Sequence, residues 1–381
     1  MKNLRRLTAL IVILVMLPLC PVHAGTTESL DKVLGFYQNN RELTSWWDMV
    51  ALWGCGENLE DYTLPLWDSS TLGENATPPD YAGIIFGLIA KGENVHDFYG
   101  RDIAYELAAM QNKSNGSFGE YINFQAYSIL ALDAAKEKYD RSLALSYLVS
   151  LEVQGGGFGF DGESADIDLT AMALLALSGS EYNDVIGRAV EFFAQNQLAN
   201  GGFESWGSEN ANTLEGVISA LSALNLSSDE RFIKNSRTLC DVLADYINSD
   251  GSLSWEPGEN EPNLFATQQG LIALSDLKYG GSVFKRLSSS YECAEEISVT
   301  AKVRIEGIDK NILNKEVIVS GTAPTVLDAI MAALESESVI YDISNSAYGS
   351  YIKAINGETA GKFGGWDGWL FLVNGASAGG S

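Results

Sequence analysis

Apolar residues recur along most of the chain in segments of two alternating kinds. Segments of the first kind carry a single apolar stripe, as in residues 184–197, where Val185, Ala189 and Phe193 share one face. Such a stripe predicts a helix that lies on a surface. Segments of the second kind, such as residues 166–178, are apolar on nearly every side and predict buried helices.

The two kinds of segment alternate along the first three quarters of the chain. The striped segments are expected to be outer helices and cover 28–40, 97–111, 140–154, 184–197 and 229–248. The buried segments are expected to be inner helices and cover 44–53, 80–91, 122–135, 166–178, 211–225 and 263–277. Helix pairs that alternate in this way can close into a ring, which predicts a mainly α protein built on an α6/α6 toroid.

A short polar turn recurs at the ends of three outer segments. Gln111, Gln154 and Gln197 each precede a glycine-containing turn that ends in phenylalanine, and the glutamines are 43 residues apart both times. A fourth copy, at residues 247–253, has lost the glutamine and the phenylalanine. A fixed period of this size is typical of a repeat architecture. The glycines permit a left-handed turn into the next inner helix, and the phenylalanine is expected to pack the corner.

The pattern changes near residue 290. Residues 298–306 alternate between apolar and polar, which predicts a half-buried strand. Further strands are expected at 317–319, 351–355 and 369–373, and a short helix with Thr325 as its N-cap is expected at 325–334. The tail of the chain is therefore expected to be a small α+β domain.

The N-terminus has the pattern of a secretory signal. Basic residues precede an apolar run that is too short for a bilayer, and Val22-His23-Ala24 offers a small-residue cleavage site. A lipidation site at Cys20 is the alternative. We expect export to the cell surface or the medium, with a signal peptide at 1–24, the toroid at 25–288, a linker at 289–296 and the small domain at 297–381.

Charge narrows the choice of partners. The chain of 381 residues carries a formal net charge of −26, which becomes −29 without residues 1–24. Such a surface favours solubility and repels nucleic acid and anionic lipid, so we expect no nucleic-acid partner. We expect a monomer and leave association with the cell envelope open. Cys55, Cys240 and Cys293 are an odd set for an exported protein, and Cys240 with Cys293 is the expected pair if one forms.

Two parts of the sequence resemble known families. The Gln-x-x-x-Gly-Gly-Phe corners resemble the repeats of prenyltransferases and squalene cyclases. The tail, through residues 325–330, 348–351, 355–357 and 368–375, resembles the C-terminal domain of the transcobalamin and intrinsic-factor group, called DUF4430 in bacteria. That group holds a corrinoid such as cobalamin between a helical toroid and the small domain, which implies the same plan here. Its members usually continue with further strands, so the small domain is expected to be truncated or to have an unpaired edge.

Polar and aromatic residues near the N-terminal ends of the inner helices are expected to meet at one mouth of the toroid. They are Tyr81, Phe124, Gln125, Asp168, Asn212, Phe265 and Gln268. The resemblance implies that such positions bind the amide groups of a corrinoid, for which Asp, Asn and Gln supply both donors and acceptors. It also implies that the opposite face of the ligand is covered by Tyr348, Tyr351, Trp366 and Trp369. Each of these residues can instead serve as a helix cap or in the core.

Two motifs resemble reactive sites but are incomplete. Asp166-Ile167-Asp168 resembles part of the Asp-x-Asp-Asp acid of class II terpene cyclases, with Leu169 in place of the last Asp. An N-cap at the start of an inner helix explains an Asp at this place equally well. Residues 54–58 resemble the thioester motif of complement-type toroids, with Asn58 in place of Gln, and predict a turn that ends a helix.

Other enzymatic functions find less support. Glycan hydrolases need paired carboxylates, whereas Asp166 and Asp168 are two apart on one helix and point to different sides. His96 is the one histidine left without the signal peptide. It is expected in a loop with no Cys near it in sequence, which argues against the Asp, Cys and His ligands of a prenyltransferase zinc site, and no Ser/His/Asp set is available. We therefore expect a small-molecule-binding protein without catalytic residues, catalytic cofactor or metal. An adhesive or scaffolding module, and an enzyme acting on glycans or terpenoids, are the alternatives.

Overall fold

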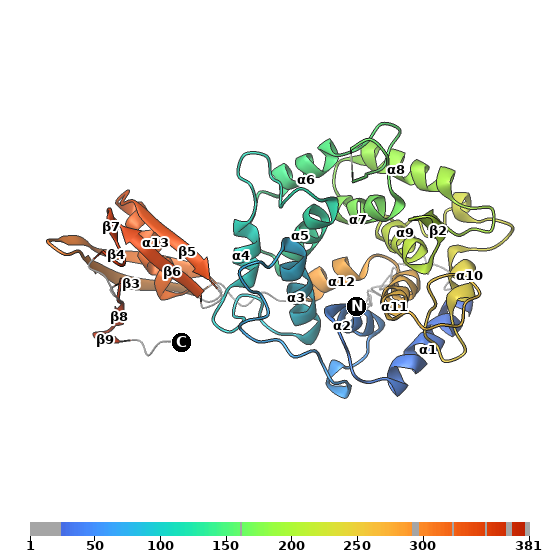
Figure 1. Ribbon diagram of the computed structural model, residues 1–381, viewed down its shortest axis with the longest axis horizontal. Helices are drawn as coiled ribbons and strands as arrows, with labels where there is room; N and C mark the ends of the chain where they lie inside the picture. The colour runs from blue at the N-terminus through green and yellow to red at the C-terminus, as the bar shows by residue number, and fades with distance from the viewer. Residues whose placement is uncertain are drawn as a thin grey trace, which may run out of the picture.

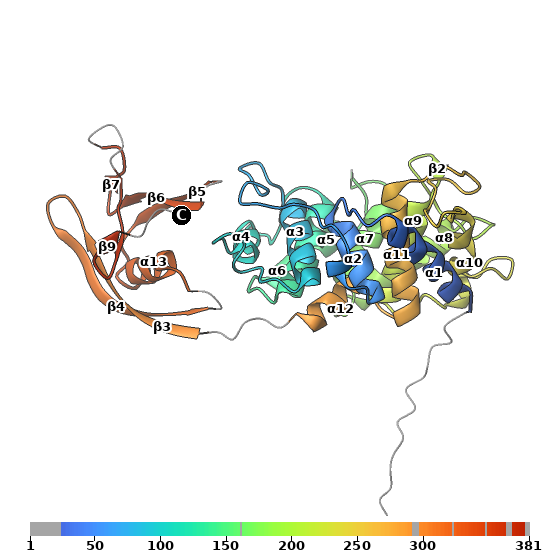
Figure 2. The ribbon, with the colours of Figure 1, turned by 90° about the horizontal axis from the view of Figure 1, so that it is seen from below.

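The computed structural model describes residues 24–160, 162–291, 297–321, 324–346, 349–362 and 368–377. Helices of the first part form a ring, and strands with one helix form a second body beside it (Figures 1 and 2). The expected fold class is confirmed: the chain is mainly helical, with a toroid followed by a small α+β part.

Six helices line the inside of the ring. They are α2 (Trp46–Cys55), α3 (Pro78–Lys91), α5 (Ile122–Ala135), α7 (Ile167–Leu177), α9 (Ala211–Ala223) and α11 (Leu264–Tyr279). Each contacts the next, and α11 contacts α2, so that the ring closes. Most of their apolar side chains belong to one buried cluster. These are the six predicted inner helices, with ends shifted by no more than two residues.

Side-chain hydrogen bonds join the first and last inner helices. At one end, Gln268 of α11 donates from Nε2 to the hydroxyl of Ser45, 3.1 Å away, and Ser45 is the N-cap of α2. At the other end, the Ser275 hydroxyl donates to the Gly54 carbonyl at 2.7 Å. Polar contacts therefore fasten both ends of the seam where the ring closes.

The outer helices match the prediction less well. Four lie near their expected places: α1 (Ala24–Asn39), α4 (Ile103–Ala109), α6 (Arg141–Ser150) and α8 (Asn183–Asn196). The predicted outer helix at 229–248 is wrong. It is divided into η2 (Glu230–Phe232), α10 (Leu239–Leu243) and η3 (Ala244–Tyr246). Asn235 and Ser236 interrupt it with φ angles of 52° and 62°, and a capping box between Thr238 and Asp241 then starts α10.

The corner turns share a geometry, but the predicted glutamine takes part in only two of the three. Gln111 and Gln197 each donate from Nε2 to a backbone carbonyl of the next outer segment. In the middle corner Glu152 takes this place and pairs with Arg188 through two bonds, whereas Gln154 is exposed. The prediction that Gln154 corresponds to Gln111 and Gln197 is therefore wrong, because the middle turn begins two residues earlier.

The corner phenylalanines are packed as expected. Phe118 is 2% exposed, and Phe158 and Phe203 are fully buried. Before Phe158 the chain passes through Gly156 and Gly157 at φ angles of 93° and 89°, which side chains other than glycine rarely adopt.

Helix α12 (Val283–Ser290) seals one end of the ring. It lies near the centre of the ring in Figure 1 and contacts α2, α3, α5 and α11. Arg286 donates to the Gly54 carbonyl at the end of α2, and Ser288 donates to the Asp133 carbonyl near the end of α5. The positive charge of Arg286 also suits the negative ends of the helix dipoles. The C-terminal ends of the inner helices are thus covered, and their N-terminal ends form the mouth.

The α+β part is built from antiparallel strands around one helix. Its elements are β3 (Ile297–Glu306), β4 (Asn311–Gly321), α13 (Val326–Ser336), β5 (Tyr341–Ser346), β6 (Gly349–Ile355), β7 (Glu358–Thr359), β8 (Leu372–Val373) and β9 (Ala376–Ser377). Helix α13 packs on β3 and β4, and the three share an apolar cluster that is separate from that of the ring. Thr325 is the N-cap of α13, as expected. The strand predicted at 369–373 pairs only at 372–373.

In both views the α+β part lies beside α4, outside the ring rather than over its centre (Figures 1 and 2). Electrostatics agrees with this placement. Burial, and then the charges of Asp328 and Glu335 on α13, raise the pKa of Tyr105 on α4. None of the helices in the described ranges has the length and apolar character that a membrane span needs.

Candidate ligand-binding site at the toroid mouth

Aromatic side chains form one wall of the mouth. Trp46 and Trp47 begin α2, and their stacked rings have centroids 4.0 Å apart. Tyr127 of α5 contacts both rings edge-on, and Phe265 of α11 lies 5.7 Å from Trp47. The capping box between Ser45 and Asp48 starts α2 here and so places both tryptophans at the mouth.

The aromatic wall continues to the sealed end of the ring. The ring of Phe86 lies 5.5 Å from Trp46 and 4.8 Å from Phe284 of α12. Close packing depends on glycine in α3, because a Cβ at Gly83 would lie 2.3 Å from the Trp46 indole nitrogen. Aromatic side chains therefore run from the mouth to α12 on this side of the toroid.

A pocket of about 360 Å³ lies against this wall. Trp46, Trp47 and Tyr127 form one side of it, and residues of α3 and the preceding loop, including Leu72 and Ile84, form the other. A cavity of this size and lining suits the apolar part of a small ligand.

Polar groups of α7, α9 and α11 lie on the other side of the mouth. Asn212 donates from Nδ2 to Gln269 Oε1 at 2.8 Å and to Glu215 Oε2 at 3.2 Å. One oxygen of Asp168, one of Asn212 and one of Glu215 are buried without a hydrogen-bond partner. Buried oxygens without a hydrogen-bond partner are uncommon and cost free energy. A ligand that donates hydrogen bonds to them would therefore be held more tightly.

Burial changes the pKa values of the carboxyl groups in this polar cluster. It raises the pKa of Asp168, and it raises the pKa of Glu215 well above the ordinary value for a glutamate. Burial, and then the charge of Asp168, also raise the pKa of Tyr127. Asp168 is therefore close enough for its charge to act on Tyr127 of the aromatic wall.

Glu215 gives a stability prediction. Because its folded pKa exceeds its unfolded pKa, the folded state binds more protons, and stability falls as pH rises above about 4.3 towards the folded pKa. Glu215→Gln is a neutral substitute and should raise the melting temperature at pH 7.5 by about 2–4 °C, with no gain at pH 4. Thermal unfolding at the two pH values measures this. An equal shift at both would contradict the assignment of a buried neutral acid.

The structure gives internal partners to three of the residues predicted for the mouth. Gln125 is fully buried and bonds only to backbone groups of the corner and of α6. Gln268 closes the ring, as described above. The Tyr81 hydroxyl donates to Glu106 and accepts from Arg101, which joins α3 to the α4 region. We therefore leave these three side chains out of the proposed site and keep Asp168 and Asn212, each of which has one buried oxygen without a hydrogen-bond partner.

Of the residues predicted to cover the ligand from the tail, the two that the structure describes are not brought to the mouth. Tyr351 is 47% exposed, and Trp369 donates from Nε1 to the Glu358 carbonyl and packs on the core of the α+β part. Neither lines the pocket at the mouth. Tyr348 and Trp366 lie outside the described residues.

Sequence reasoning missed the residues that dominate the mouth, namely Trp46, Trp47, Tyr127, Glu215 and Gln269. The Ser45-x-x-Asp48 capping box was a usable signal for the tryptophans, because it fixes the start of α2. The choice between Gln268 and Gln269 had no such signal, since one residue turns a helix by about 100°.

The reactive motifs are accounted for by local structure. Asp166 is the N-cap of α7 and accepts from the Leu169 backbone N–H. Helix α2 ends at Cys55, and Gly56 follows at a φ angle of 86°, which confirms the expected turn. Burial raises the pKa of the Cys55 thiol to about 12, so it is a poor nucleophile. Cys55 and Cys240 are buried free thiols, and Cys293 lies outside the described residues.

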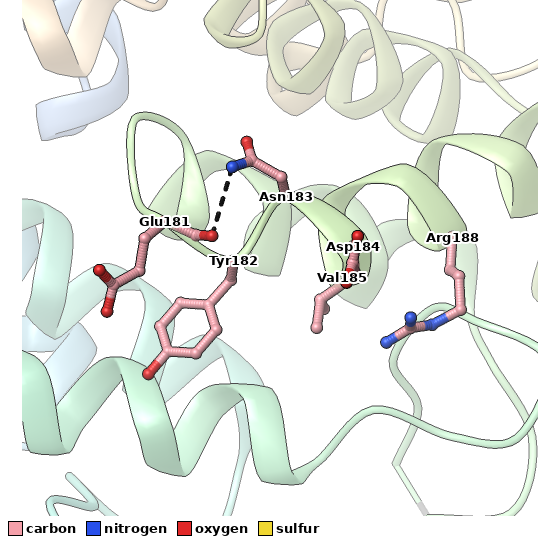
Figure 3. A pocket seen from close by; sticks show the side chains of 6 residues that line it. All are labelled: Glu181, Tyr182, Asn183, Asp184, Val185 and Arg188. Carbon is pink, nitrogen blue, oxygen red and sulfur yellow. Dashed lines mark hydrogen bonds between the residues drawn. The ribbon is translucent and has the colours of Figure 1, made fainter.

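A second pocket, of about 500 Å³, lies on the outside of the ring at the start of α8 (Figure 3). Its walls are mostly exposed and polar, and they include Glu181, Asp184 and Arg188. The guanidinium of Arg188 is already paired with Glu152. This pocket lacks the buried, unpartnered groups that distinguish the mouth.

Comparison with known proteins supplies structural likenesses. No family model matches the chain, and no curated protein sequence matches it. Haptocorrin in complex with Cbi (cobinamide) is 16% identical over 95% of this chain and 94% of its own, with a TM-score of 0.43. A variant of the type II terpene cyclase MstE from Scytonema, in complex with its product merosterolic acid A, is 15% identical over 68% of this chain and 98% of its own, with a TM-score of 0.44. These likenesses concern the course of the chain alone.

Proposed function

We propose that this protein binds a small molecule at the toroid mouth and that the ligand is a corrinoid such as cobinamide or cobalamin. The observation that carries the proposal is the aromatic wall of Trp46, Trp47 and Tyr127 beside buried acceptors of Asp168 and Asn212 that lack donors. A flat, largely apolar ligand with amide N–H groups on its rim complements both sides.

The size of the pocket bears on how such a ligand would be held. About 360 Å³ is near the lower end of the range for ligand pockets, so the mouth would hold one edge of a corrinoid. We propose that the α+β part supplies the second wall by moving from the side of α4 to the mouth. Its exposed apolar strip, Leu370–Val373, supports this, because such a strip favours contact with a ligand or a second surface. Export through the N-terminal signal remains part of the same proposal.

Variants of the mouth test the proposed site. Trp47→Ala and Asn212→Ala should each weaken cobinamide binding about 10-fold or more, because one removes a stacked ring and the other a polar partner. Tyr279→Ala is the matched control, since Tyr279 is an exposed aromatic residue whose hydroxyl donates to the Cys55 carbonyl at the sealed end. Titration followed by tryptophan fluorescence gives the three affinities. Equal weakening by Tyr279→Ala would contradict the assignment of the mouth.

A second candidate function, terpenoid cyclisation, is favoured by the environment of Asp168. Its carboxyl has a raised pKa and an unpartnered oxygen, and its charge reaches Tyr127 of the aromatic wall. A carboxylic acid can protonate an alkene, and aromatic faces beside it can stabilise the resulting cation. Incubation with squalene, followed by mass spectrometry, tests this. A cyclised product that Asp168→Asn abolishes would favour the enzyme over the binding protein.

A further inference from the structure

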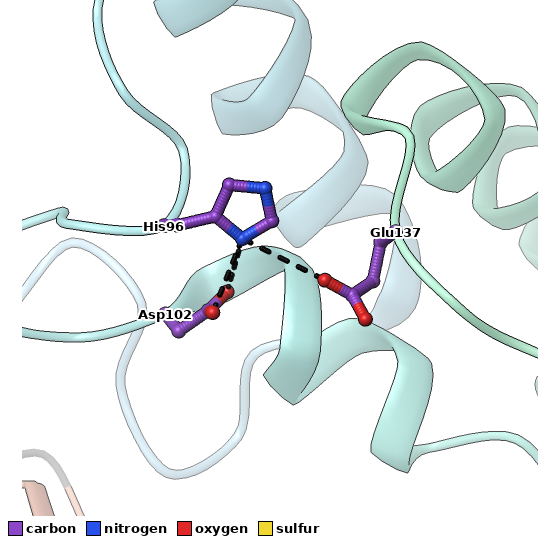
Figure 4. A group of neighbouring side chains, drawn as sticks. All are labelled: His96, Asp102 and Glu137. Carbon is purple, nitrogen blue, oxygen red and sulfur yellow. Dashed lines mark hydrogen bonds and ion pairs between the residues drawn. The ribbon is translucent and has the colours of Figure 1, made fainter. Parts of the chain in front are cut away.

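Three metal-ligating side chains meet in the wall of the toroid, away from the mouth. His96 comes from the loop after α3, Asp102 is the N-cap of α4, and Glu137 follows α5 (Figure 4). His96 Nδ1 lies 3.1 Å from both carboxylate oxygens of Asp102 and 3.6 Å from Glu137 Oε2. The side chain of His96 is 5% exposed and that of Glu137 is 15% exposed, whereas that of Asp102 is 37% exposed, so the cluster is open to water on the side of Asp102.

These distances fit an ion pair and also fit ligands that share a metal ion. Zinc binds histidine nitrogen and carboxylate oxygen at about 2.0–2.2 Å, which places neighbouring ligands of a tetrahedral site about 3.3 Å apart. The distances from His96 Nδ1 to the two carboxylates, 3.1 and 3.6 Å, lie on either side of that value. Potential ligand atoms of all three residues lie within 4.8 Å of one another. A water molecule can complete the set.

The orientation of the imidazole also fits. The ring of His96 hydrogen-bonds the backbone of Ala135 as well as facing the carboxylates. A metal-bound histidine commonly uses its second nitrogen in this way, which fixes the ring and its tautomer. Nδ1 faces two carboxylates, and this arrangement needs either a proton on the nitrogen or a metal ion between the groups.

We propose that His96, Asp102 and Glu137 bind one divalent transition-metal ion, with Zn²⁺ preferred. An imidazole with two carboxylates in a partly buried site suits zinc, whereas Ca²⁺ takes six to eight oxygen ligands and Mg²⁺ retains several waters. This set needs one histidine and no cysteine, unlike the Asp, Cys and His set considered from the sequence. The ion would tie together the loop after α3, the start of α4 and the end of α5, beside the α+β part. The site is independent of the ligand proposed for the mouth.

Calorimetric titration of the EDTA-stripped full chain with ZnCl₂ tests the site. We expect one ion per chain, with affinity reduced at least about 10-fold by His96→Ala and by Glu137→Gln. Asp102→Asn keeps a good N-cap and should also weaken binding, so it guards against loss of folding. Glu163→Gln, in an exposed acidic loop, is the control and should leave the affinity unchanged.

A spectroscopic readout separates a metal site from an ion pair. Co²⁺ added to the stripped wild-type chain should give the visible absorption of tetrahedral coordination, which Glu137→Gln should abolish while the circular dichroism stays unchanged. Zinc binding by His96→Ala that equals the wild type would overturn the proposal in favour of adventitious surface binding. A folded wild-type chain that takes up neither Zn²⁺ nor Co²⁺ would overturn it in favour of a protonated histidine paired with two carboxylates.

Discussion

Arg286→Met should destabilise the toroid by about 3 kcal/mol at pH 8 and by clearly less at pH 5. Arg286 anchors α12: it donates to the Gly281 carbonyl and the Ser275 hydroxyl, and it lies 3.4 Å from Asp276. Losing these hydrogen bonds costs free energy at every pH. The part that depends on pH comes from Asp276, which is fully buried.

The sign follows from the titration of Asp276. Burial raises its pKa to about 7, and the charge of Arg286 opposes that rise. The unfolded pKa is about 3.9, so the folded state binds more protons between pH 4 and 7, and stability falls as pH rises through that range. Without Arg286 the folded pKa is higher, so the fall continues above pH 7. The variant therefore loses more at pH 8 than at pH 5.

Urea unfolding of the wild type and Arg286→Met at both pH values measures this effect. Asp276→Asn removes the charge but keeps an oxygen that can accept from the Val283 backbone N–H, as Asp276 does. In that background Arg286→Met should cost the same at pH 5 and pH 8. If the cost of Arg286→Met in the otherwise unchanged chain does not depend on pH, Asp276 is not coupled to Arg286 in the way described.

Phe203→Ala should cost about 3–5 kcal/mol of stability. Phe203 is fully buried at the corner between α8 and α9, and its ring contacts Phe193. Truncation leaves a cavity among helices that contact each other around a closed ring, so the walls can collapse only in part.

Phe160→Ala is the matched control for this corner. Phe160 is 58% exposed and contacts the ring of Trp206, so its loss should cost less than about 1 kcal/mol. Urea unfolding followed by helical circular dichroism compares the two variants. Similar costs would show that the corner phenylalanines do not support the ring in the way their burial indicates.

The periodicity of apolar residues was sufficient to predict the toroid. Helices that are apolar all round have to be buried, so all six inner helices were found. Spacing was a weaker guide to the corners, because Glu152 can occupy the place of a corner glutamine by pairing with Arg188. The prediction of one helix over 229–248 failed for a local reason. Asn235 and Ser236 adopt left-handed φ angles, which a stripe of apolar residues does not reveal.

The candidate site was harder to predict than the fold. Asp168 and Asn212 were predicted because they begin inner helices. Of the aromatic wall only Phe265 was predicted, because the contacts of the wall between different helices form only after the ring closes. His96, Asp102 and Glu137 come from three segments, so their meeting depends on the packing of α4 against α5. The position of the α+β part relative to the mouth is not encoded in any local pattern.

Binding of a corrinoid at the mouth is the central claim, and calorimetric titration of the full chain with cobinamide and cyanocobalamin tests it most directly. We expect saturable one-to-one binding with a Kd below about 1 μM, or about −8 kcal/mol, and much weaker binding by Trp47→Ala. The absence of heat from a chain whose unfolding transitions show both parts to be folded would contradict the claim.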